Sequence, residues 1–440
     1  MVDKVYPAQS RRDLCGAWIV SVNMGYGHQR TAYPLSFLAP QQKVINANDY
    51  QGIPRRDKVM WETMRGFYEA VSRFSRLPFV GRIIFSIYDQ LQKIASFYPK
   101  RDMSRPNFSL WEVFLFMKEG WGRHLMEKLT QKPLPLITTF FTPAFMAEFF
   151  GYPGEIFCVV CDADISRTWA PLRSKASRIK YFAPTSRAAE RLQLYGVKKE
   201  NIFLTGYPLP PENIGSEKLE KLKEDLKQRL VNLDPQKKYF AKYQKLIEIT
   251  LGNLPEKPSR PLTILFSVGG AGAQKETALK ILKSLKNEIK GNKIKIILSA
   301  GTKAEVKKYF EASIKKTYKK QLAGDKAEII FGQDIESYFQ RFNTALRETD
   351  ILWTKPSELS FYSALGIPLI IAPPIGSQEQ FNMRWLLKSG FGMKQENLKY
   401  ISQWLFDWLN EGYLAEAAMQ GFVEGEKLGT YNIQKIISSA

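Results

Sequence analysis

The chain has 440 residues, of which 44% are hydrophobic and 24% are charged, and this composition is that of a folded protein with room for two domains. It excludes a chain that is mainly disordered. The formal net charge of +21 indicates an anionic partner, either a phosphorylated substrate, an anionic lipid surface or nucleic acid. Because nucleic-acid binding rests on charge alone, we do not favour it.

Three cysteines are too few for a disulfide framework, so they favour a reducing compartment. Cys158 and Cys161 form a C-x-x-C, but the surrounding Ile-Phe-Cys-Val-Val-Cys is typical of a buried strand rather than of a redox pair. We see no signal peptide, and the longest apolar stretch, residues 134–150, is interrupted by two prolines and a glutamate. We therefore expect a cytoplasmic protein whose contact with a membrane is peripheral.

The first predicted strand covers residues 17–22, and a loop with two glycines follows it. Gly25 and Gly27 allow a tight turn and a close approach of the backbone to a ligand, before a helix that we expect to start near Thr31. His28 lies in this loop. A neutral imidazole can remove the proton of an acceptor hydroxyl, so His28 is a candidate catalytic base. The alternative is a loop histidine that hydrogen-bonds to the backbone.

Residues 58–128 mix aromatic and aliphatic side chains with arginines at helical spacing. Such a basic amphipathic surface can lie in a lipid interface. The alternative is a set of helices that pack on the domain core and expose a basic face to solvent. The second histidine of the chain, His124, is most simply a partly buried helix residue.

Strands are next predicted over residues 134–141 and 156–161, and the second ends in Asp162-Ala163-Asp164. A D-x-D motif can share a divalent cation with a diphosphate. Here, however, it follows a strand of an α/β unit, so we expect no metal and a polar, acceptor-side role for Asp162. Another strand, helix and strand over residues 181–205 complete the first domain.

Residues 216–258 are rich in Lys, Glu and Leu, and they predict one long charged helix that ends in a group of prolines. The second domain then opens with a strand over residues 262–268. The small residues that follow it, Gly269, Gly270, Ala271 and Gly272, let backbone N–H groups approach phosphate oxygens. Further strands are predicted over residues 294–298, 329–331, 351–353 and 369–372.

Polar residues gather after the last two of these strands. The first ends at Thr354-Lys355-Pro356-Ser357, where Ser357 can cap a helix that begins at Glu358. The second is followed by Gly376-Ser377-Gln378-Glu379 at the start of another helix, whose first N–H groups have no partner within the helix. Open α/β sheets build ligand sites at the carboxyl ends of their strands, so we expect a ligand site here.

This region resembles the C-terminal half of GT-B glycosyltransferases that use UDP-sugars. The branch in question contains monogalactosyldiacylglycerol synthase, processive diacylglycerol glucosyltransferases and the lipid-linked peptidoglycan N-acetylglucosaminyltransferase. The positions that match the family pattern are Thr354, Lys355, Pro356, Leu359, Ser360, Ala364, Leu365, Gly366, Pro368, Gly376, Gln378, Glu379 and Asn382. Residues 25–32 resemble its glycine-rich loop with a histidine, residues 269–273 resemble its diphosphate loop, and Asp162 and Trp169 match an Asp and a Trp that follow a strand.

One departure from the family concerns the ribose. The family's glycine pair is replaced by Ser357 and Glu358, and its acidic residue that holds the ribose falls on Ser363. Either Glu358 supplies the carboxylate from one turn earlier, or ribose recognition is weaker in this protein.

The resemblance implies an α/β fold of the GT-B class, in which two Rossmann-like domains face a cleft. An acceptor-side domain would cover residues 1–212, with a helical aromatic insertion at about 55–130. A charged linker over residues 213–260 would precede a nucleotide-sugar domain over residues 261–400. The C-terminal helices, residues 401–440, often return to the first domain in such folds.

The function implied by the resemblance is transfer of a sugar from a UDP-sugar to a lipid or membrane-associated acceptor, by an inverting reaction that needs no metal and no cofactor. The protein would act peripherally, on the inner face of an anionic membrane. His28 and Asp162 would be catalytic, and Gly25 and Gly27 would form the acceptor-side loop. The donor would contact Gly269, Gly270, Ala271, Gly272, Lys355, Ser357, Glu358, Ser363, Gln378 and Glu379. The alternatives are a catalytically degenerate protein that binds a nucleotide-sugar or a partner at a membrane, and an epimerase that acts on UDP-N-acetylglucosamine.

Overall fold

A computed structural model describes residues 16–63, 94–269, 272, 274–318 and 326–439. The chain divides into two compact units. The described residues of the N-terminal unit lie within 16–208, 376–381 and 428–439, and those of the C-terminal unit lie within 209–375 and 382–427. Across the described residues, no helix combines the length and the hydropathy that crossing a membrane would require.

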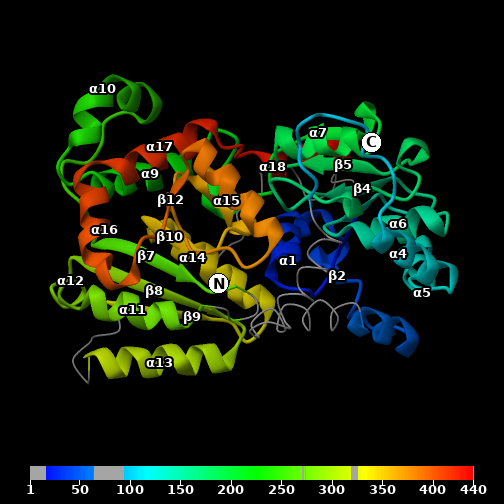
Figure 1. Ribbon diagram of the computed structural model, residues 1–440, viewed down its shortest axis with the longest axis horizontal. Helices are drawn as coiled ribbons and strands as arrows, with labels where there is room; N and C mark the ends of the chain where they lie inside the picture. Colours follow the sequence, from blue (N-terminus) through cyan, green and yellow to red (C-terminus); the bar gives the residue numbers. More distant parts are fainter. Residues whose placement is uncertain (1–15, 64–93, 270–271, 273, 319–325, 440) are drawn as a thin grey trace. The chain divides into compact units, whose positions relative to one another are not determined.

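The described part of the N-terminal unit is built on a parallel six-stranded sheet, of which Figure 1 labels β2, β4 and β5. The strand order is β2-β1-β3-β4-β5-β6. Its strands are short and mostly buried, as expected for a parallel sheet that is covered on both faces. Their bounds are β1 Trp18–Ser21, β2 Ile45–Asn46, β3 Leu136–Thr138, β4 Ile156–Val159, β5 Lys180–Ala183 and β6 Ile202–Leu204.

Two helices of this unit, α4 and α7, begin at a side-chain cap. Asn107 accepts a hydrogen bond from the backbone N–H of Leu110 at the start of α4, and Thr185 accepts one from Ala188 at the start of α7. Residues 55–63 are also helical. The others are α1 Tyr26–Ala32, α4 Phe108–Lys118, α5 Arg123–Thr130, α6 Phe141–Phe149, α7 Ser186–Leu194, α18 Gly429–Ser438, and the 3₁₀ helices η1 Tyr33–Leu38, η2 Pro40–Gln42, η3 Arg167–Trp169, η4 Ser174–Ala176 and η5 Lys199–Asn201.

The described part of the C-terminal unit has a second parallel six-stranded sheet, in the order β12-β11-β10-β7-β8-β9. The strands are β7 Leu262–Ser267, β8 Ile294–Gly301, β9 Ala327–Phe331, β10 Ile351–Thr354, β11 Leu369–Ile371 and β12 Gly392–Lys394. The two sheets confirm the predicted fold class of two Rossmann-like α/β domains. Residues 64–93 of the predicted aromatic insertion lie outside the described residues.

The helices of the C-terminal unit correct one prediction. Residues 216–258 do not form one long helix, because Pro235 follows the end of α9 and Lys237 has a left-handed backbone with φ of 54° before α10 begins. The bounds are α8 Pro211–Ile214, α9 Glu220–Leu233, α10 Lys238–Leu251, α11 Glu276–Ser284, α12 Lys286–Lys290, α13 Ala304–Tyr318, α14 Ile335–Glu348, η6 Glu358–Leu365, α15 Ser377–Ser389, η7 Leu398–Tyr400, α16 Ile401–Asn410 and α17 Tyr413–Glu424.

Arg229 ties α9 to the rest of the C-terminal unit. Its guanidinium is buried and donates hydrogen bonds to the carbonyl oxygens of Thr349 at 2.7 Å and Leu365 at 2.8 Å, which lie at the ends of α14 and η6. Carbonyl groups at helix ends have no partner within the helix, so a buried cation satisfies them. Burial lowers the pKa of Arg229 to about 10.

We expect Arg229→Met to lower the free energy of unfolding of the C-terminal unit by about 3 kcal/mol, because it leaves buried carbonyl groups without a donor. Arg347→Met is the matched control, since Arg347 pairs with Asp225 with 42% of its side chain exposed. Such a pair contributes less than about 1 kcal/mol. Urea denaturation measures both variants, and equal losses would contradict this role for Arg229.

Candidate functional site

In each sheet, the order in which the chain adds strands reverses at one position, called a switch point. The candidate residues lie next to these two switch points. In the N-terminal unit the chain goes from β1 to β2 on one side of β1 and then to β3 on its other side. In the C-terminal unit it goes from β7 through β8 to β9 and then returns to β10 on the opposite side of β7. The loops that leave such a switch point diverge, and ligands of open α/β sheets bind there.

His28 lies at the switch point of the N-terminal unit. The prediction that the helix starts near Thr31 is wrong, because α1 begins at Tyr26, so Gly27 and His28 belong to its first turn. Gly25 precedes the helix with φ of 104°, a conformation that side chains strongly disfavour. Asn23 and Asn48 exchange two hydrogen bonds between side chain and backbone, and these hold the preceding loop.

Thr139, which follows β3, determines which ring nitrogen of His28 carries the proton. His28 Nδ1 lies 2.8 Å from the carbonyl oxygen of Thr139. A carbonyl oxygen can only accept, so Nδ1 must donate, and the lone pair of the neutral ring is then on Nε2. The hydroxyl of Thr139 in turn donates to the carbonyl oxygen of His28 at 2.9 Å. The histidine is therefore held from two directions in the tautomer that a general base requires.

The surroundings of the imidazole are half-buried and aromatic. The ring of Phe140 lies edge-on at 4.7 Å between centroids, and that of Trp169 lies at 6.4 Å. Cys161, which lies just after β4, has its Sγ 3.5 Å from Nδ1 of His28. Cys158 and Cys161 are both buried free thiols, and burial raises the pKa of Cys158 well above its usual value.

The two carboxylates of the D-x-D motif have different surroundings. Asp164 forms a buried two-point ion pair with Arg191, with both N···O distances at 2.8 Å. Asp162 lies beside Cys161, whose Sγ is 3.9 Å from its Oδ2, and is thus the carboxylate on the side of His28. Among the residues that the structure describes, no three His, Cys, Asp or Glu side chains are grouped as metal ligands.

In the C-terminal unit, the structure brings Gly269 and Lys355 together at the switch point between β7 and β10. Thr354 pairs with Ser267 in register, so the loops after the two strands leave the sheet side by side. A Cβ at Gly269 would lie 2.4 Å from Cε of Lys355, which means that the lysine stem lies directly against this glycine. A cation next to a glycine-rich loop is an arrangement suited to a diphosphate.

The loop that begins at Gly269 is closed by a hydrogen bond of 2.7 Å from the N–H of Gly272 to the carbonyl oxygen of Gly269. Gly272 has φ of 68°, which favours glycine. The side chain of Gln274 donates to the carbonyl oxygen of Pro373 at 2.9 Å and so connects this loop to the loop after β11. Gly270 and Ala271, which we predicted as donor-binding residues, lie outside the described residues.

The residues predicted near the ribose differ in accessibility. Ser357 occupies the cap position of η6, but it makes no capping hydrogen bond, and the predicted α-helix is a 3₁₀ helix. Glu358 is half-buried on the first turn of η6. Ser363 is 1% exposed, and its hydroxyl donates to the carbonyl oxygen of Ser360 at 2.8 Å. Glu358 is thus the more accessible of the two candidates for a ribose contact.

Gln378 and Glu379 lie on the first turn of α15 and are half-buried. The start of α15 groups with the N-terminal unit, and Gln378 Nε2 donates to Asp162 Oδ2 at 3.4 Å. Sequence reasoning therefore placed Gln378 correctly at a helix start but missed this partner. It also missed Thr139, although two threonines at the end of a predicted strand were a signal for a polar contact.

Comparisons with known proteins bear on the class of protein and on the fold. A family model described as a domain of unknown function (DUF6938) matches residues 255–326. The processive diacylglycerol beta-glucosyltransferase of Bacillus subtilis (strain 168) is 22% identical over 382 residues, which cover 84% of this chain and 81% of the relative. The predicted resemblance to GT-B glycosyltransferases is confirmed by this relative.

Two solved structures have a backbone that aligns with that of this chain. MurG of Acinetobacter baumannii aligns with a TM-score of 0.47 at 12% identity, over 97% of this chain and 100% of that one. The UDP-GlcNAc 2-epimerase of Neisseria meningitidis, bound to UDP-GlcNAc, aligns with a TM-score of 0.44 at 14% identity, over 77% and 83%. Neither score is high enough to bear on function.

We expect Lys355→Met to weaken UDP binding about 10- to 100-fold, because one charge-assisted hydrogen bond contributes roughly 1.5–3 kcal/mol. Lys388→Met is the control, since Lys388 is exposed in the last turn of α15 in the same unit. Isothermal titration with UDP at low and high salt measures both. A variant at Lys355 that binds as tightly as the unmodified protein would remove this lysine from the site.

Proposed function

We propose that the protein is a glycosyltransferase that moves a sugar from a UDP-sugar to a lipid or membrane-associated acceptor. The observation that carries this proposal is the hydrogen bond between His28 Nδ1 and the Thr139 carbonyl oxygen, because it prepares Nε2 to accept a proton. The likeness to a diacylglycerol glucosyltransferase supports the reaction class, and the cation at Gly269 supports a diphosphate donor.

The proposed reaction is a single displacement with inversion at the anomeric carbon. The acceptor oxygen forms a bond to that carbon while the bond between the carbon and the diphosphate oxygen breaks. His28 Nε2 takes the acceptor proton, and the electron pair leaves with UDP. Asp162 orients the acceptor. The charge that develops on the leaving group is stabilised by Lys355 and by the loop that begins at Gly269, so a metal is not required.

Donor recognition follows from the same geometry. We assign the ribose contact to Glu358, because the hydroxyl of Ser363 is buried and already donates to Ser360. Gln378 and Glu379 contact sugar hydroxyls from the first turn of α15. Gly25 and Gly27 shape the acceptor loop.

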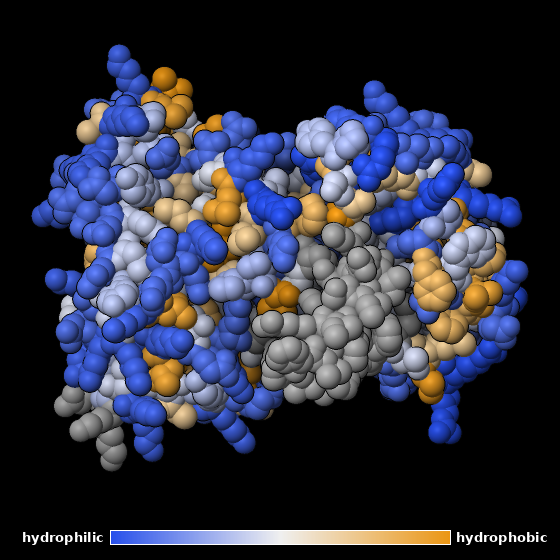
Figure 2. Space-filling model, viewed as in Figure 1, coloured by the Kyte–Doolittle hydropathy of each residue, from blue (hydrophilic) through white to orange (hydrophobic). Residues whose placement is uncertain are grey.

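The membrane contact is assigned to α4. Phe108, Trp111 and Leu115 are 61%, 48% and 56% exposed, and their spacing places them on one face of the helix. Lys118 lies over the ring of Phe114 at 5.2 Å and adds a cation to this surface. Hydrophobic side chains gather in this region of the N-terminal unit in Figure 2. Together with the net charge of +21, these residues favour peripheral binding to the anionic inner face of a membrane.

A second candidate function is binding of a nucleotide-sugar without catalysis. It is favoured by the replacement of the family's glycine pair by Ser357 and Glu358. Titration with UDP, paired with an assay for sugar transfer and release, separates the two functions. Tight binding without turnover would support the second candidate.

His28→Ala should lower kcat about 10²- to 10⁴-fold and leave UDP affinity unchanged, because it removes only the general base. His124→Ala is the control, since this second histidine of the chain lies on α5, with its Nδ1 2.9 Å from the hydroxyl of Tyr50. Transfer is measured from radiolabelled UDP-glucose, UDP-galactose and UDP-N-acetylglucosamine to extracted membrane lipids. Full activity of His28→Ala would exclude it as the base.

Replacing Phe108, Trp111 and Leu115 by serine should lower the partition onto anionic vesicles by about tenfold per residue, because each loses roughly 1.5 kcal/mol of apolar burial. Leu204→Ser is the control, since Leu204 is 52% exposed on β6 of the same unit. Flotation with and without anionic lipid measures the partition. An unchanged partition in the triple variant would contradict membrane binding by α4.

A further inference from the structure

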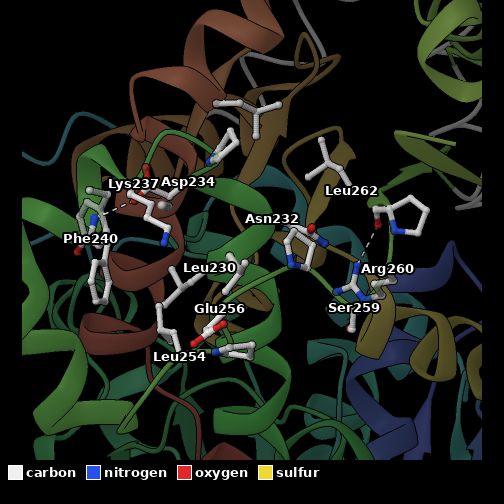
Figure 3. Close-up of a pocket in the computed structure, with 18 of the residues that line it drawn as sticks. Leu230, Asn232, Asp234, Lys237, Phe240, Leu254, Glu256, Ser259, Arg260 and Leu262 are labelled. Atoms are coloured by element: carbon white, nitrogen blue, oxygen red, sulfur yellow. Dashed lines mark hydrogen bonds between the residues drawn. The ribbon is translucent and has the colours of Figure 1, made fainter. Parts of the chain in front are cut away.

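A cavity of about 970 Å³ lies in the C-terminal unit, at the edge of the sheet where the strands begin (Figure 3). Leu262 and Ile294, the first residues of β7 and β8, line it. Because all strands are parallel, the loop at Gly269 leaves the opposite edge, roughly 20 Å away across six residues of β7. The cavity is therefore separate from the candidate nucleotide site.

The wall of this cavity is mainly apolar, although polar side chains such as Asn232, Arg260 and Asn410 also line it. The apolar side chains that line it include Leu230, Ile247, Leu254, Phe406, Leu409 and Ala415. Four prolines also line it, Pro235, Pro255, Pro258 and Pro261, and proline has no backbone N–H to offer to a phosphate. The volume is at the upper end of the range of about 300–1,000 Å³ that small-molecule sites have. Such a wall suits an aliphatic chain rather than a nucleotide.

Asp234, just past the end of α9, is a buried carboxylate that lines the cavity. This side chain is 7% exposed, and its Oδ2 accepts a hydrogen bond of 2.8 Å from the N–H of Phe240 on the first turn of α10 (Figure 3). Among the described residues, its Oδ1 is a buried oxygen with no hydrogen-bond partner. A buried carboxylate oxygen without a donor costs free energy, so a ligand that donates a hydrogen bond is favoured and an anion is disfavoured.

The cations around the cavity do not reverse this preference. Arg260 is held by Asp350, with N···O distances of 2.6 and 2.7 Å. Lys237 and Lys293 are exposed to solvent. Water screens such exposed charges more strongly than it screens the buried Asp234.

Helix α10 connects the cavity with an apolar outer surface. Ile247 lines the cavity from this helix, whereas Leu246 and Ile249 on its other side are 45% and 86% exposed. Lys242 and Lys245 on the same helix are also exposed. A helix with apolar residues on both sides and lysines on the outer side can rest on a lipid surface.

We propose that this cavity binds an aliphatic amphiphile whose uncharged head group donates a hydrogen bond, such as a hydroxyl, to Oδ1 of Asp234. The aliphatic chain lies against the apolar wall. This site is independent of the proposed sugar transfer, because it lies at the other edge of the sheet. Two sources share the chemistry, a lipid that leaves a bilayer along α10 and a free amphiphile in solution.

The head-group preference is tested on the full chain with 1-monolauroylglycerol and laurate, which have the same acyl chain. We expect the neutral amphiphile to bind at least about tenfold more tightly than the anion. Asp234→Asn keeps an oxygen for the N–H of Phe240 and removes the charge, so the preference should shrink. Glu256→Gln, at an exposed carboxylate that also lines the cavity, should leave it unchanged. Absence of binding, equal binding of both amphiphiles, or an unchanged preference in Asp234→Asn would overturn the proposal.

The position of the site is tested with Leu254→Trp, which adds volume to a half-buried wall residue outside the helices. This variant should lose binding of 1-monolauroylglycerol and keep its affinity for UDP, which also shows that it folds. Retained amphiphile binding would overturn the placement. Ile249→Ser then distinguishes the sources: reduced uptake from vesicles, with unchanged binding in solution, identifies the bilayer as the source. Val423→Ser, 49% exposed on α17, is the matched control.

Discussion

The parallel pairing of the strands is the constraint on which the other features of this protein depend. A parallel pair needs a crossover, so every strand in a sheet ends at the same edge and the connecting helices cover both faces. The sequence places its chemically distinctive residues just after strand ends, and parallel pairing then gathers them. His28 meets Thr139 because β1 and β3 are neighbours, and Lys355 meets Gly269 because β7 and β10 are neighbours. In both units the meeting point is the switch point, where the loops diverge and leave room for a ligand.

The sequence predicted most of this framework, and its failures have physical reasons. Runs of buried β-branched and aromatic residues predicted ten of the twelve strands in the described residues. The edge strands β2 and β12 were missed because each contains only one large apolar residue and so shows no such run. The start of α1 was predicted too late because both glycines were assigned to the turn, whereas only Gly25, with φ of 104°, makes the turn and Gly27 is already helical. The break between α9 and α10 at Pro235 was missed because the residues on both sides of it are rich in Lys, Glu and Leu, which predicted one continuous helix. Sequence spacing also could not reveal that Ser363 is buried with its hydroxyl already engaged, since burial depends on tertiary packing.

The two candidate residues His28 and Lys355 are held in place by different kinds of contact. His28 is positioned by hydrogen bonds to the carbonyl oxygen and from the hydroxyl of Thr139, and the partner that sets the tautomer is a main-chain group. Lys355 is positioned by contact, since its stem rests on a glycine that a larger residue could not replace without moving the lysine. In both cases a small or main-chain group does the positioning. A main-chain carbonyl leaves no trace in a motif, which explains why the motif indicated His28 and not Thr139, whereas the glycine-rich motif did include Gly269.

The same parallel geometry explains why a second cavity can coexist with a nucleotide site in one domain. The carboxyl edge of the sheet carries N–H groups of loops and helix starts, which favour anions. The opposite edge of this sheet is closed by a proline-rich segment and by α10, and at the start of α10 the carboxylate of Asp234 already accepts a backbone N–H. An anion therefore finds donors at one edge and a buried carboxylate at the other. The two sites proposed for the C-terminal unit, one for a polar ligand and one for an apolar ligand, are thus separated by about the length of a strand.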